Sequence, residues 1–576
     1  MRRLVRFLKP YKLHVFLGPA CKLIEAIFEL IVPLVMADMI DVGVRTGNTA
    51  YLWEKGGVLV LLGVVGLSST LVCQVLASKA SQAVGTDLRR ELFAHINTLG
   101  WKELDRFGTP TLITRLTGDI NQMQTAVAML IRLVVRAPFL VIGAIIMAMR
   151  IDMQLSLVFL AIVPIMSFIL WFVMSRSVPF FKTIQRKTDR VGLITRENLA
   201  GVRVVRAFRN QETEKERFDA ACDDLAANAI SIGKLNAILS PFSFLLLNIG
   251  CVAILLFGGD RVNTGSLTQG EVVAFINYMN QILIALVVVA NLVVIFTKAA
   301  ASASRINEVF DTVPSVDDPA EAVATDDAAP AVSFRNVSFA YYEGAELALD
   351  RVSLDIARGE TVGVIGGTGS SKSTLIQLIP RLYDATSGSV LVAGVDVKDY
   401  PLHQLHRKIG MVPQGNVLFS GTIRENMRWR APEATDEQIW AALRAAQAED
   451  FVRALPEGLD APVSQKGANF SGGQKQRLTI ARALVGQPEI LILDDASSAL
   501  DYATDAALQQ ALHNIEPRPA TLLVSQRVST VRRCDRIVVM DEGEIVGVGS
   551  HEHLLDTCPT YQEIAASQLT AEEVSA

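Results

Sequence analysis

The sequence predicts two fold classes in one chain: an all-α transmembrane domain of six helices, followed by a soluble α/β domain with a largely parallel sheet. Most long apolar runs lie in the first half of the 576 residues. After residue 330, short β-rich runs alternate with helical segments, which is typical of an α/β fold. Hydrophobic residues make up 50% and charged residues 20%, and the mean hydropathy is +0.34, which excludes a wholly soluble or disordered chain.

Six apolar stretches are candidate membrane spans, because each has about the 20 apolar residues that a bilayer-crossing helix needs. They lie near residues 14–42, 56–80, 126–149, 153–175, 236–260 and 269–297. The polar stretches 81–125 and 176–235 keep a helical period and are rich in Lys and Arg, whereas the short loops between spans carry few basic residues. By the positive-inside rule, both long stretches and both chain ends are expected in the cytoplasm. The helices should therefore extend well beyond the bilayer.

Charged residues lie well inside two of the predicted spans, away from the span ends. Lys22, Glu25 and Glu29 belong to the first span, and Arg132 and Arg136 belong to the third. Charges at such depth usually face a cavity or one another. We favour structural ion pairs or a rim near the cytosol, and contact with a substrate is the alternative.

The domain boundaries follow from composition. Residues 1–310 are predicted to form the transmembrane domain, and residues 331–576 the α/β domain. Between them, residues 311–330 hold three prolines with acidic and small residues and no apolar period, which is typical of a linker. The net charge of -5 and the pI of about 5.9 give no indication of nucleic-acid binding. The six cysteines lie far apart, which favours buried thiols over a disulfide scaffold or a zinc site.

A glycine-rich string marks a phosphate-binding loop. GGTGSSKST follows the buried run TVGVIG and precedes an apolar helix. Glycines let backbone N–H groups surround a phosphate, and the helix N-terminus adds partial positive charge. Lys372 is expected to reach the terminal phosphates and Ser373 to ligate Mg²⁺. Ser371 stands where the pattern has Gly, so its Cβ is expected to disfavour the required backbone angle. The predicted ATP-binding residues of this loop are Gly366, Gly367, Thr368, Gly369, Ser370, Ser371, Lys372, Ser373 and Thr374.

Two further strings complete the phosphate chemistry. The buried run ILILDD ends in Asp494, which is placed to hold Mg²⁺, and in Asp495, which occupies the position of the general base that orients the attacking water. The string NFSGGQKQR lies between this run and the phosphate loop. Its Ser471, Gly472 and Gly473 are expected at a helix N-terminus, where free N–H groups bind anions.

The order of these motifs resembles that of an ABC transporter. The phosphate loop, VPQ at 412–414, SGGQ, ILILDD, SALD at 498–501 and SQR at 525–527 occur in sequence, as in the nucleotide-binding P-loop ATPase domain of that family. The spans with two long cytoplasmic loops resemble the ABC exporter membrane domain. The chain is most similar to the degenerate-site subunit of bacterial heterodimeric multidrug-type exporters. The resemblance implies a multi-pass half-transporter of the bacterial inner membrane that uses ATP and Mg²⁺, with its termini and nucleotide-binding domain in the cytoplasm.

The resemblance also implies roles for individual residues. Tyr341 matches the aromatic residue that stacks on adenine, with Tyr342 as the alternative. Gln414 matches the glutamine that touches Mg²⁺, and Asp501 ends the D-loop. The signature that faces a partner's ATP comprises Phe470, where Leu is usual, with Ser471, Gly472, Gly473 and Gln474. Two coupling helices are expected near 105–116 and 205–212.

Besides Phe470, three positions depart from the family pattern. Asp495 replaces the usual catalytic Glu and is one methylene shorter; a misplacement of about 1 Å can lower a rate about 100-fold. Gln526 replaces the switch histidine and cannot carry a proton at neutral pH as His can. Together with Ser371, these changes predict a degenerate site that binds ATP but hydrolyses it slowly. The alternative is tolerated drift in a working ATPase.

The predicted partner is a second, different half-transporter. In this family each ATP lies between the phosphate loop of one domain and the signature of the other, so the intact signature here would complete a partner's active site. The pair is expected to export an amphipathic drug, lipid or peptide, in contact with membrane lipid and without nucleic acid. The alternatives are an importer of iron chelates with the exporter fold, and a regulator or channel gated by ATP binding.

Overall fold

The computed structural model describes residues 4–319, 321–342, 344–496 and 498–568. The chain forms two compact units, one of Met1–Asn97 with Thr109–Asp311 and the other of Thr98–Gly108 with Thr312–Ala576. The first unit is all-α and the second is α/β, as the sequence predicts. The domain boundaries at 310 and 330 stay predictions.

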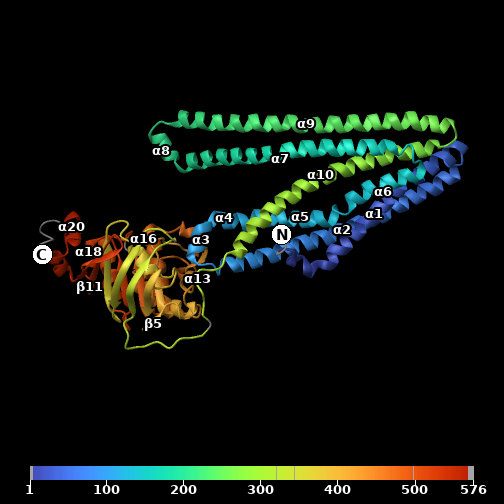
Figure 1. Cartoon of the computed structure of the whole chain (residues 1–576). Helices are drawn as coiled ribbons and strands as arrows, with labels where there is room; N and C mark the ends of the chain where they lie inside the picture. Colours follow the sequence, from blue (N-terminus) through green and yellow to red (C-terminus); the bar gives the residue numbers. More distant parts are fainter. Residues whose placement is uncertain (1–3, 320, 343, 497, 569–576) are drawn as a thin grey trace. The chain divides into compact units, whose positions relative to one another are not determined.

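Long helices build the first unit (Figure 1). After a 3₁₀ helix at Leu4–Tyr11, the helices are α1 Lys12–Asp38, α2 Thr49–Ile96, α4 Thr109–Thr114, α5 Ile120–Arg132, α6 Arg136–Ile151, α7 Leu157–Ala200, α8 Val202–Ala207, α9 Gln211–Asn263 and α10 Gln269–Asp311, with π-helical turns at Met39–Val44 and Arg115–Asp119. The helices α7 and α9 lie side by side and are joined by the short α8 (Figure 1). The 48 residues of α2 span about 72 Å, more than twice the roughly 30 Å of bilayer hydrocarbon.

Five helical stretches of the described chain are long and apolar enough to cross a membrane, judged by length and composition. They are Thr49–Ile96, Thr109–Ile151, Leu157–Arg176, Pro241–Asn263 and Gln269–Asp311. These stretches correspond to the second to sixth predicted spans. The first predicted span is helical within α1, but Lys22, Glu25 and Glu29 give it more charge than the other five carry. Its crossing of the membrane stays a prediction.

The helices α1 and α10 pack closely, and one glycine permits this. A Cβ on Gly270 would lie 2.3 Å from the carbonyl oxygen of Ala37. The N–H of Gly270 donates to Asp41 Oδ1 at 2.8 Å, and Tyr278 Oη donates to the Leu30 carbonyl at 2.7 Å. These contacts place the start of α10 against the end of α1.

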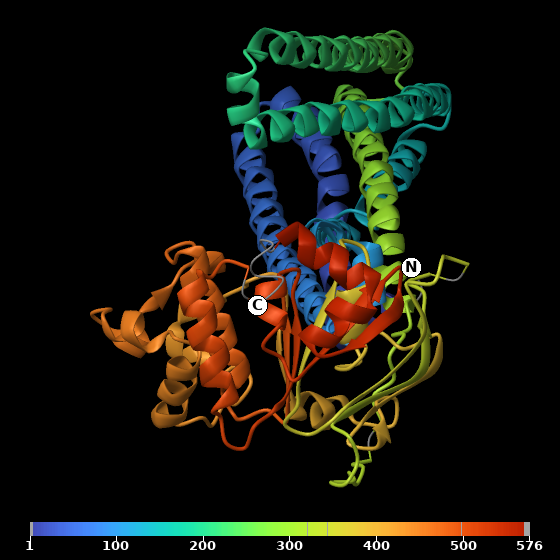
Figure 2. The ribbon, with the colours of Figure 1, turned by 90° about the vertical axis from the view of Figure 1, so that its left-hand side faces the viewer.

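The second unit contains two main sheets with helices beside them. Its elements are α3 Trp101–Phe107, β1 Val332–Phe339, β2 Leu349–Ile356, β3 Thr361–Gly366, α11 Lys372–Gln377, β4 Ser387–Val392, β5 Val395–Asp396, α12 Leu402–Lys408, β6 Ile409–Val412, β7 Gly421–Thr422, α13 Ile423–Met427, α14 Asp436–Ala445, α15 Glu449–Arg453, β8 Pro462–Val463, α16 Gly472–Leu484, β9 Ile490–Asp494, α17 Tyr502–His513, β10 Ala520–Val524, α18 Val528–Val531, β11 Arg536–Asp541, β12 Glu544–Gly549, α19 His551–Thr557 and α20 Pro559–Gln568, with 3₁₀ turns at Gly458–Asp460 and Gln465–Gly467. The helices between β7 and β9 gather on one side of the sheets (orange, left in Figure 2).

The larger sheet has the strand order β12-β11-β3-β10-β9-β6, and all its neighbours are parallel except β12, which is antiparallel to β11. The predicted parallel sheet is therefore confirmed. A second sheet, β2-β1-β4-β5, is wholly antiparallel, and the sequence analysis did not anticipate it.

The carboxyl ends of the parallel strands meet at one edge of the larger sheet. Val524 of β10 pairs with Asp494 of β9 and with Val364 of β3. The phosphate loop, Asp495 and Gln526 all follow these strand ends in the chain. In open parallel sheets, ligands bind in the crevice outside this edge.

The short helix α3 belongs to the second unit, although it follows α2 in the chain. Tyr383 Oη donates to Asp105 Oδ2 at 2.7 Å, and Ser315 Oγ donates to Glu103 Oε2 at 3.0 Å. Burial and the Asp105 carboxylate raise the pKa of Tyr383, so this hydroxyl stays a donor at neutral pH. The predicted coupling segment 105–116 covers the end of α3, all of α4 and the start of the π-helical turn that follows. The segment 205–212 covers the end of α8 and the start of α9. Their coupling roles stay predictions.

Candidate nucleotide-binding site

The phosphate loop holds its lysine at the centre of the loop. Lys372 Nζ donates to the carbonyls of Gly366 and Gly367 at 2.9 and 2.6 Å, and to Ser370 Oγ at 3.0 Å. Burial lowers the pKa of Lys372, and Asp494 and Asp495 oppose that shift. An ammonium held among carbonyl oxygens is positioned to exchange these partners for phosphate oxygens.

Ser371 adopts the backbone conformation that its pattern assigns to glycine. Its φ is 67° and its ψ is 23°, in the left-handed region. A residue with a Cβ pays about 1–2 kcal/mol for this conformation. The unfavourable backbone angle expected from the sequence is therefore present as strain at the start of α11.

Two substitutions at position 371 should differ in their effect on the melting temperature. We expect Ser371→Gly to maintain or raise the melting temperature of the full chain. We expect Ser371→Val to lower it by about 2–4 °C for each 1 kcal/mol lost, because a β-branched residue fits the left-handed region poorly. Differential scanning fluorimetry of the full chain checks both. Equal melting temperatures for the two variants would contradict strain at this position.

Two oxygen ligands meet where Mg²⁺ is expected. Ser373 Oγ donates to Asp494 Oδ1 at 3.0 Å. Asp494 is buried at the end of β9; burial raises its pKa, and the bond from Ser373 opposes the shift. A buried carboxylate beside a hydroxyl is the oxygen donor set that Mg²⁺ prefers, so these residues fit the ion.

Asp495 lies next to this pair in an unusual conformation. Its φ is 50°, which Asp tolerates better than most residues. Its N–H donates to the Val524 carbonyl at 3.0 Å. Burial raises the pKa of Asp495, and Arg527 and Lys372 oppose the shift. The carboxylate is thus attached to a fixed backbone position beside the phosphate loop.

One cavity of about 290 Å³ brings most of the predicted catalytic and phosphate-binding residues together. Its lining comprises Thr368, Gly369, Ser371, Lys372, Ser373, Thr374, Gln414, Asp494, Asp495, Val524, Ser525 and Gln526. The loop after β6 supplies Gln414, and the loop after β10 supplies Gln526. Among the described residues that line it, none belongs to the signature.

The predicted adenine contact lies beside the phosphate loop. Tyr341 Oη and Thr374 Oγ1 are hydrogen-bonded at 2.9 Å. The ring of Tyr341 packs edge-on against Phe339 and Tyr383, with centroids 4.9 and 5.5 Å away. Tyr342 is 59% exposed instead. The stacking role of Tyr341 stays a prediction.

The signature forms a capped helix start. Ser471 Oγ accepts from the Gln474 N–H at 3.3 Å, and Gln474 Oε1 accepts from the Ser471 N–H at 2.9 Å. Phe470 is buried in the core beneath. The N-terminus of the 13-residue α16 thereby presents Gly472 and Gly473 for an anion.

Gln476 connects three parts of the site and was not identified from the sequence. Its side chain is buried; Nε2 donates to the Asp495 carbonyl at 3.3 Å, and Oε1 accepts from the Ala499 N–H at 2.9 Å. Asp501 caps α17 by accepting from the N–H and hydroxyl of Thr504, both at 2.9 Å, which lowers the pKa of Asp501. The signature helix, Asp495 and the D-loop are therefore mechanically linked.

Gln568 of the last described helix, α20, holds the loop that contains Gln526, which we call the switch loop. Gln568 Nε2 donates to the Gln526 carbonyl at 2.7 Å, and Gln568 Oε1 accepts from the Val528 N–H at 2.9 Å. No sequence signal pointed to Gln568, because its partners lie about 40 residues earlier.

Removing this connection should loosen the switch loop. We expect Gln568→Leu to increase hydrogen exchange of the buried Val528 amide by about 5-fold, because a hydrogen bond contributes about 1 kcal/mol. Gln562→Leu is the matched control, since Gln562 Nε2 donates to Leu555 within the C-terminal helices. Exchange mass spectrometry of residues 525–531 checks the difference. Equal exchange in both variants would contradict the connection.

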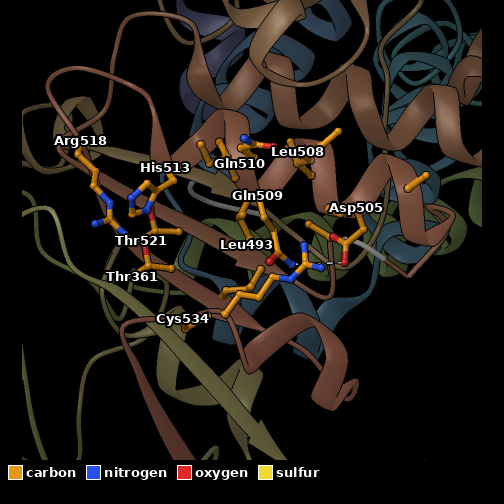
Figure 3. A pocket seen from close by; sticks show the side chains of 17 residues that line it. Thr361, Leu493, Asp505, Leu508, Gln509, Gln510, His513, Arg518, Thr521 and Cys534 are labelled. Carbon is orange, nitrogen blue, oxygen red and sulfur yellow. Dashed lines mark hydrogen bonds between the residues drawn. The ribbon is translucent and has the colours of Figure 1, made fainter. Parts of the chain in front are cut away.

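A larger cavity of about 550 Å³ lies elsewhere in the second unit (Figure 3). Its lining includes Asp505 and His513 of α17 with Arg518 and Cys534, and none of the predicted site residues. Burial raises the pKa of Cys534 to about 12, so the thiol is protonated and unreactive at neutral pH. This cavity supplies no group to the phosphate chemistry.

Comparisons with known proteins show the family of the chain. The family of the ABC transporter transmembrane region matches residues 15–287, and the ABC transporter family matches residues 349–498. The chain is 39% identical over 570 residues to an uncharacterized ABC transporter ATP-binding protein of Mycobacterium tuberculosis, with 97% of each chain covered. It is 31% identical over 578 residues to an ATP-dependent lipid A-core flippase of Syntrophus aciditrophicus, covering 100% of this chain and 95% of the flippase.

A solved structure is similar over the whole length. It is a bacterial Atm1-family ABC exporter with ATP bound, with a TM-score of 0.79 and 25% identity, covering 98% of this chain and 99% of that chain. The fused membrane and ATPase domains, the apolar helices and these relatives together show a multi-pass membrane protein that couples ATP hydrolysis to transport. The chain therefore belongs to the ABC transporter family, as an exporter-type half-transporter.

Proposed function

We propose that this half-transporter pairs with a second, different half-transporter to export an amphipathic substrate. In this pair, its own phosphate loop builds a slow site and its signature completes the partner's active site. One observation carries the proposal: Ser371, Asp495 and Gln526, which depart from the family pattern, all line a single cavity, whereas the signature keeps its capped helix start.

The cavity favours binding over turnover. Residues 366–374 and Tyr341 would hold ATP, and Ser373, Asp494 and Gln414 would hold Mg²⁺, which neutralises charge on the phosphate oxygens. Asp495 is one methylene shorter than Glu, and its backbone is held by Val524 and Gln476. It therefore reaches less far toward an attacking water, and Gln526 supplies no titrating group in place of histidine.

The signature supports a role on a partner's ATP. Its N–H groups and the positive end of α16 suit the phosphates of a nucleotide. No described signature residue lines this chain's own phosphate cavity, so an ATP bound there needs a second domain to complete its site. Two copies of this chain would make two slow sites, whereas a partner with the usual Glu and His would make one competent site.

The relatives support an amphipathic substrate. One is named an ATP-dependent lipid A-core flippase, and a solved structure is described as an ABC exporter. Export of a lipid-like molecule is therefore the favoured activity.

ATPase measurements in nanodiscs test the proposal. The full chain is assayed alone and together with the half-transporter encoded beside it, and bound nucleotide is measured in both samples. We expect the chain alone to be nearly inactive, and the pair to hydrolyse ATP while retaining one nucleotide. Turnover by the chain alone at the rate of the pair would overturn the slow site and favour a homodimer.

A further inference from the structure

Charged side chains gather inside the membrane unit, on α1 and around the break between α5 and α6. Lys22 pairs with Glu25, and Arg136 Nη2 lies 2.7 Å from Glu29 Oε2. Arg136 Nε also lies 3.9 Å from Glu25 Oε1. The ion pairs favoured from the sequence are therefore confirmed, and they neutralise both carboxylates.

Arg132 has no such partner. Among the residues that the structure describes, it makes no hydrogen bond or ion pair, and its Nε is buried without a partner. Three cations, Lys22, Arg132 and Arg136, thus face two carboxylates, which leaves one positive charge uncompensated. Arg132 is partly buried, and a cation without a partner inside a membrane span is costly, so it needs either a partner or a function.

The position of Arg132 is inside the bundle. The preceding residue, Ile131, packs against Gly18 of α1: a Cβ on Gly18 would lie 2.3 Å from Ile131 Cγ2. The helix α5, which ends at Arg132, packs against both α1 and α2. The arginine therefore adjoins α1 and α2, and burial of its Nε is consistent with this placement.

The depth of the cluster suits a polar head group. Counted from the end of α6 at Ile151, Arg136 and Arg132 lie about 22 and 28 Å along the helices. The hydrocarbon layer is about 30 Å thick, and the loop after α6 is on the outer side. Both arginines therefore lie in the cytoplasmic half, Arg132 near its boundary.

A second polar group in the same region is also unsatisfied. Gln281 of α10 donates from Nε2 to the Glu29 carbonyl at 3.0 Å, while its Oε1 is buried without a partner. The cluster thus contains free hydrogen-bonding capacity of both kinds: a guanidinium donor for an anion and an amide acceptor for a hydroxyl.

We infer that this cluster, formed by Lys22, Glu25, Glu29, Arg132 and Arg136, binds the anionic head group of an amphipathic substrate, with Arg132 as its direct contact. The inference rests on the proposed transport function and names its substrate class. A guanidinium binds a phosphate or carboxylate through paired N–H donors, and a cationic head group would meet the excess positive charge. The substrate is therefore an anionic amphiphile rather than a cationic drug.

Binding of fluorescent short-chain lipids to the pair in phosphatidylcholine nanodiscs tests this inference. The probes are labelled phosphatidylglycerol and labelled phosphatidylcholine with identical chains. We expect the wild-type pair to bind the phosphatidylglycerol probe more tightly by about 10-fold or more, because a hydrogen-bonded ion pair with the head group is at stake. Arg132→Gln should abolish that preference, and Arg132→Lys should retain most of it.

Arg90→Gln is the matched control, because the Arg90 side chain is 78% exposed on α2. It should keep the full preference. No preference in the wild-type pair, or an equal loss in Arg90→Gln, would overturn the inference. Competition by inorganic phosphate separates the two sources of the anion: displacement of the probe by phosphate alone would assign the cluster to a free anion and overturn the lipid assignment. The ATPase and nucleotide measurements on the wild-type pair need no probe, so the proposed function can fail or succeed independently.

Discussion

Replacing Gly472 with Glu should lower the ATPase rate of the assembled pair by about 100-fold or more. The substitution places a carboxylate at the helix start that is proposed to face the partner's ATP. Two like charges about 4 Å apart at an effective dielectric of 20 repel by about 4 kcal/mol, and each 1.4 kcal/mol is tenfold in rate.

The fold should tolerate this change. An acidic residue is favourable in the first turn of a helix, and the nearest atom to a Cβ on Gly472 is Ala499 Cβ at 3.9 Å. Gly472→Gln is the neutral control of the same shape and should cost much less. We also expect Gly472→Glu to leave nucleotide retention by this chain's own phosphate loop intact. A pair that keeps its full ATPase rate with Gly472→Glu would show that the signature does not complete the competent site.

Restoring the residues that the family usually has at positions 495 and 526 should activate this chain's own site. The double variant Asp495→Glu with Gln526→His should raise the single-turnover rate of ATP hydrolysis by the chain alone by about 10-fold or more. General base chemistry contributes about 100-fold or more, and a positioning error of about 1 Å costs about 100-fold. The expected gain is smaller than these values combined, because Asp495 has a φ of 50°, which Glu tolerates less well.

The control for this variant is Asp495→Asn with Gln526→His, which restores the switch residue but removes the carboxylate and should stay inactive. The active variant should also gain a pH dependence near the histidine pKa of about 6.5, which the Gln526 protein lacks. A rate that is unchanged in the double variant would place the cause of slow turnover outside these two positions.

The ATP site could be predicted from the sequence to a large extent. The phosphate loop, the acidic strand end and the signature are short contiguous strings, and the backbone of each is set mainly by its own residues. Ser371 illustrates this, because the sequence predicts a backbone angle that a Cβ disfavours, and the structure has a left-handed angle there. The parallel strands then bring the loops that follow them to one edge of the sheet.

The contacts that only the structure revealed join residues distant in the chain. Gln568 hydrogen-bonds Gln526, about 40 residues earlier in the chain, and Gln476 joins Asp495 to Ala499. The helix α3 belongs to the second unit, where its Asp105 accepts a hydrogen bond from Tyr383. None of these residues carries a local signal, since a glutamine or tyrosine in a helix or loop has many possible partners.

The charged residues of the membrane spans show the same division between what the sequence determines and what only the structure reveals. The sequence alone determined that this protein has apolar spans with three cations and two carboxylates well inside the first and third, followed by a phosphate-binding α/β domain. Periodicity and motif spacing are local properties. Only the tertiary structure decided that Glu25 and Glu29 are taken by Lys22 and Arg136, which leaves Arg132 without a partner. The physical reason is that ion pairing depends on which helix faces meet, and helix packing is set by side-chain shape across the whole unit.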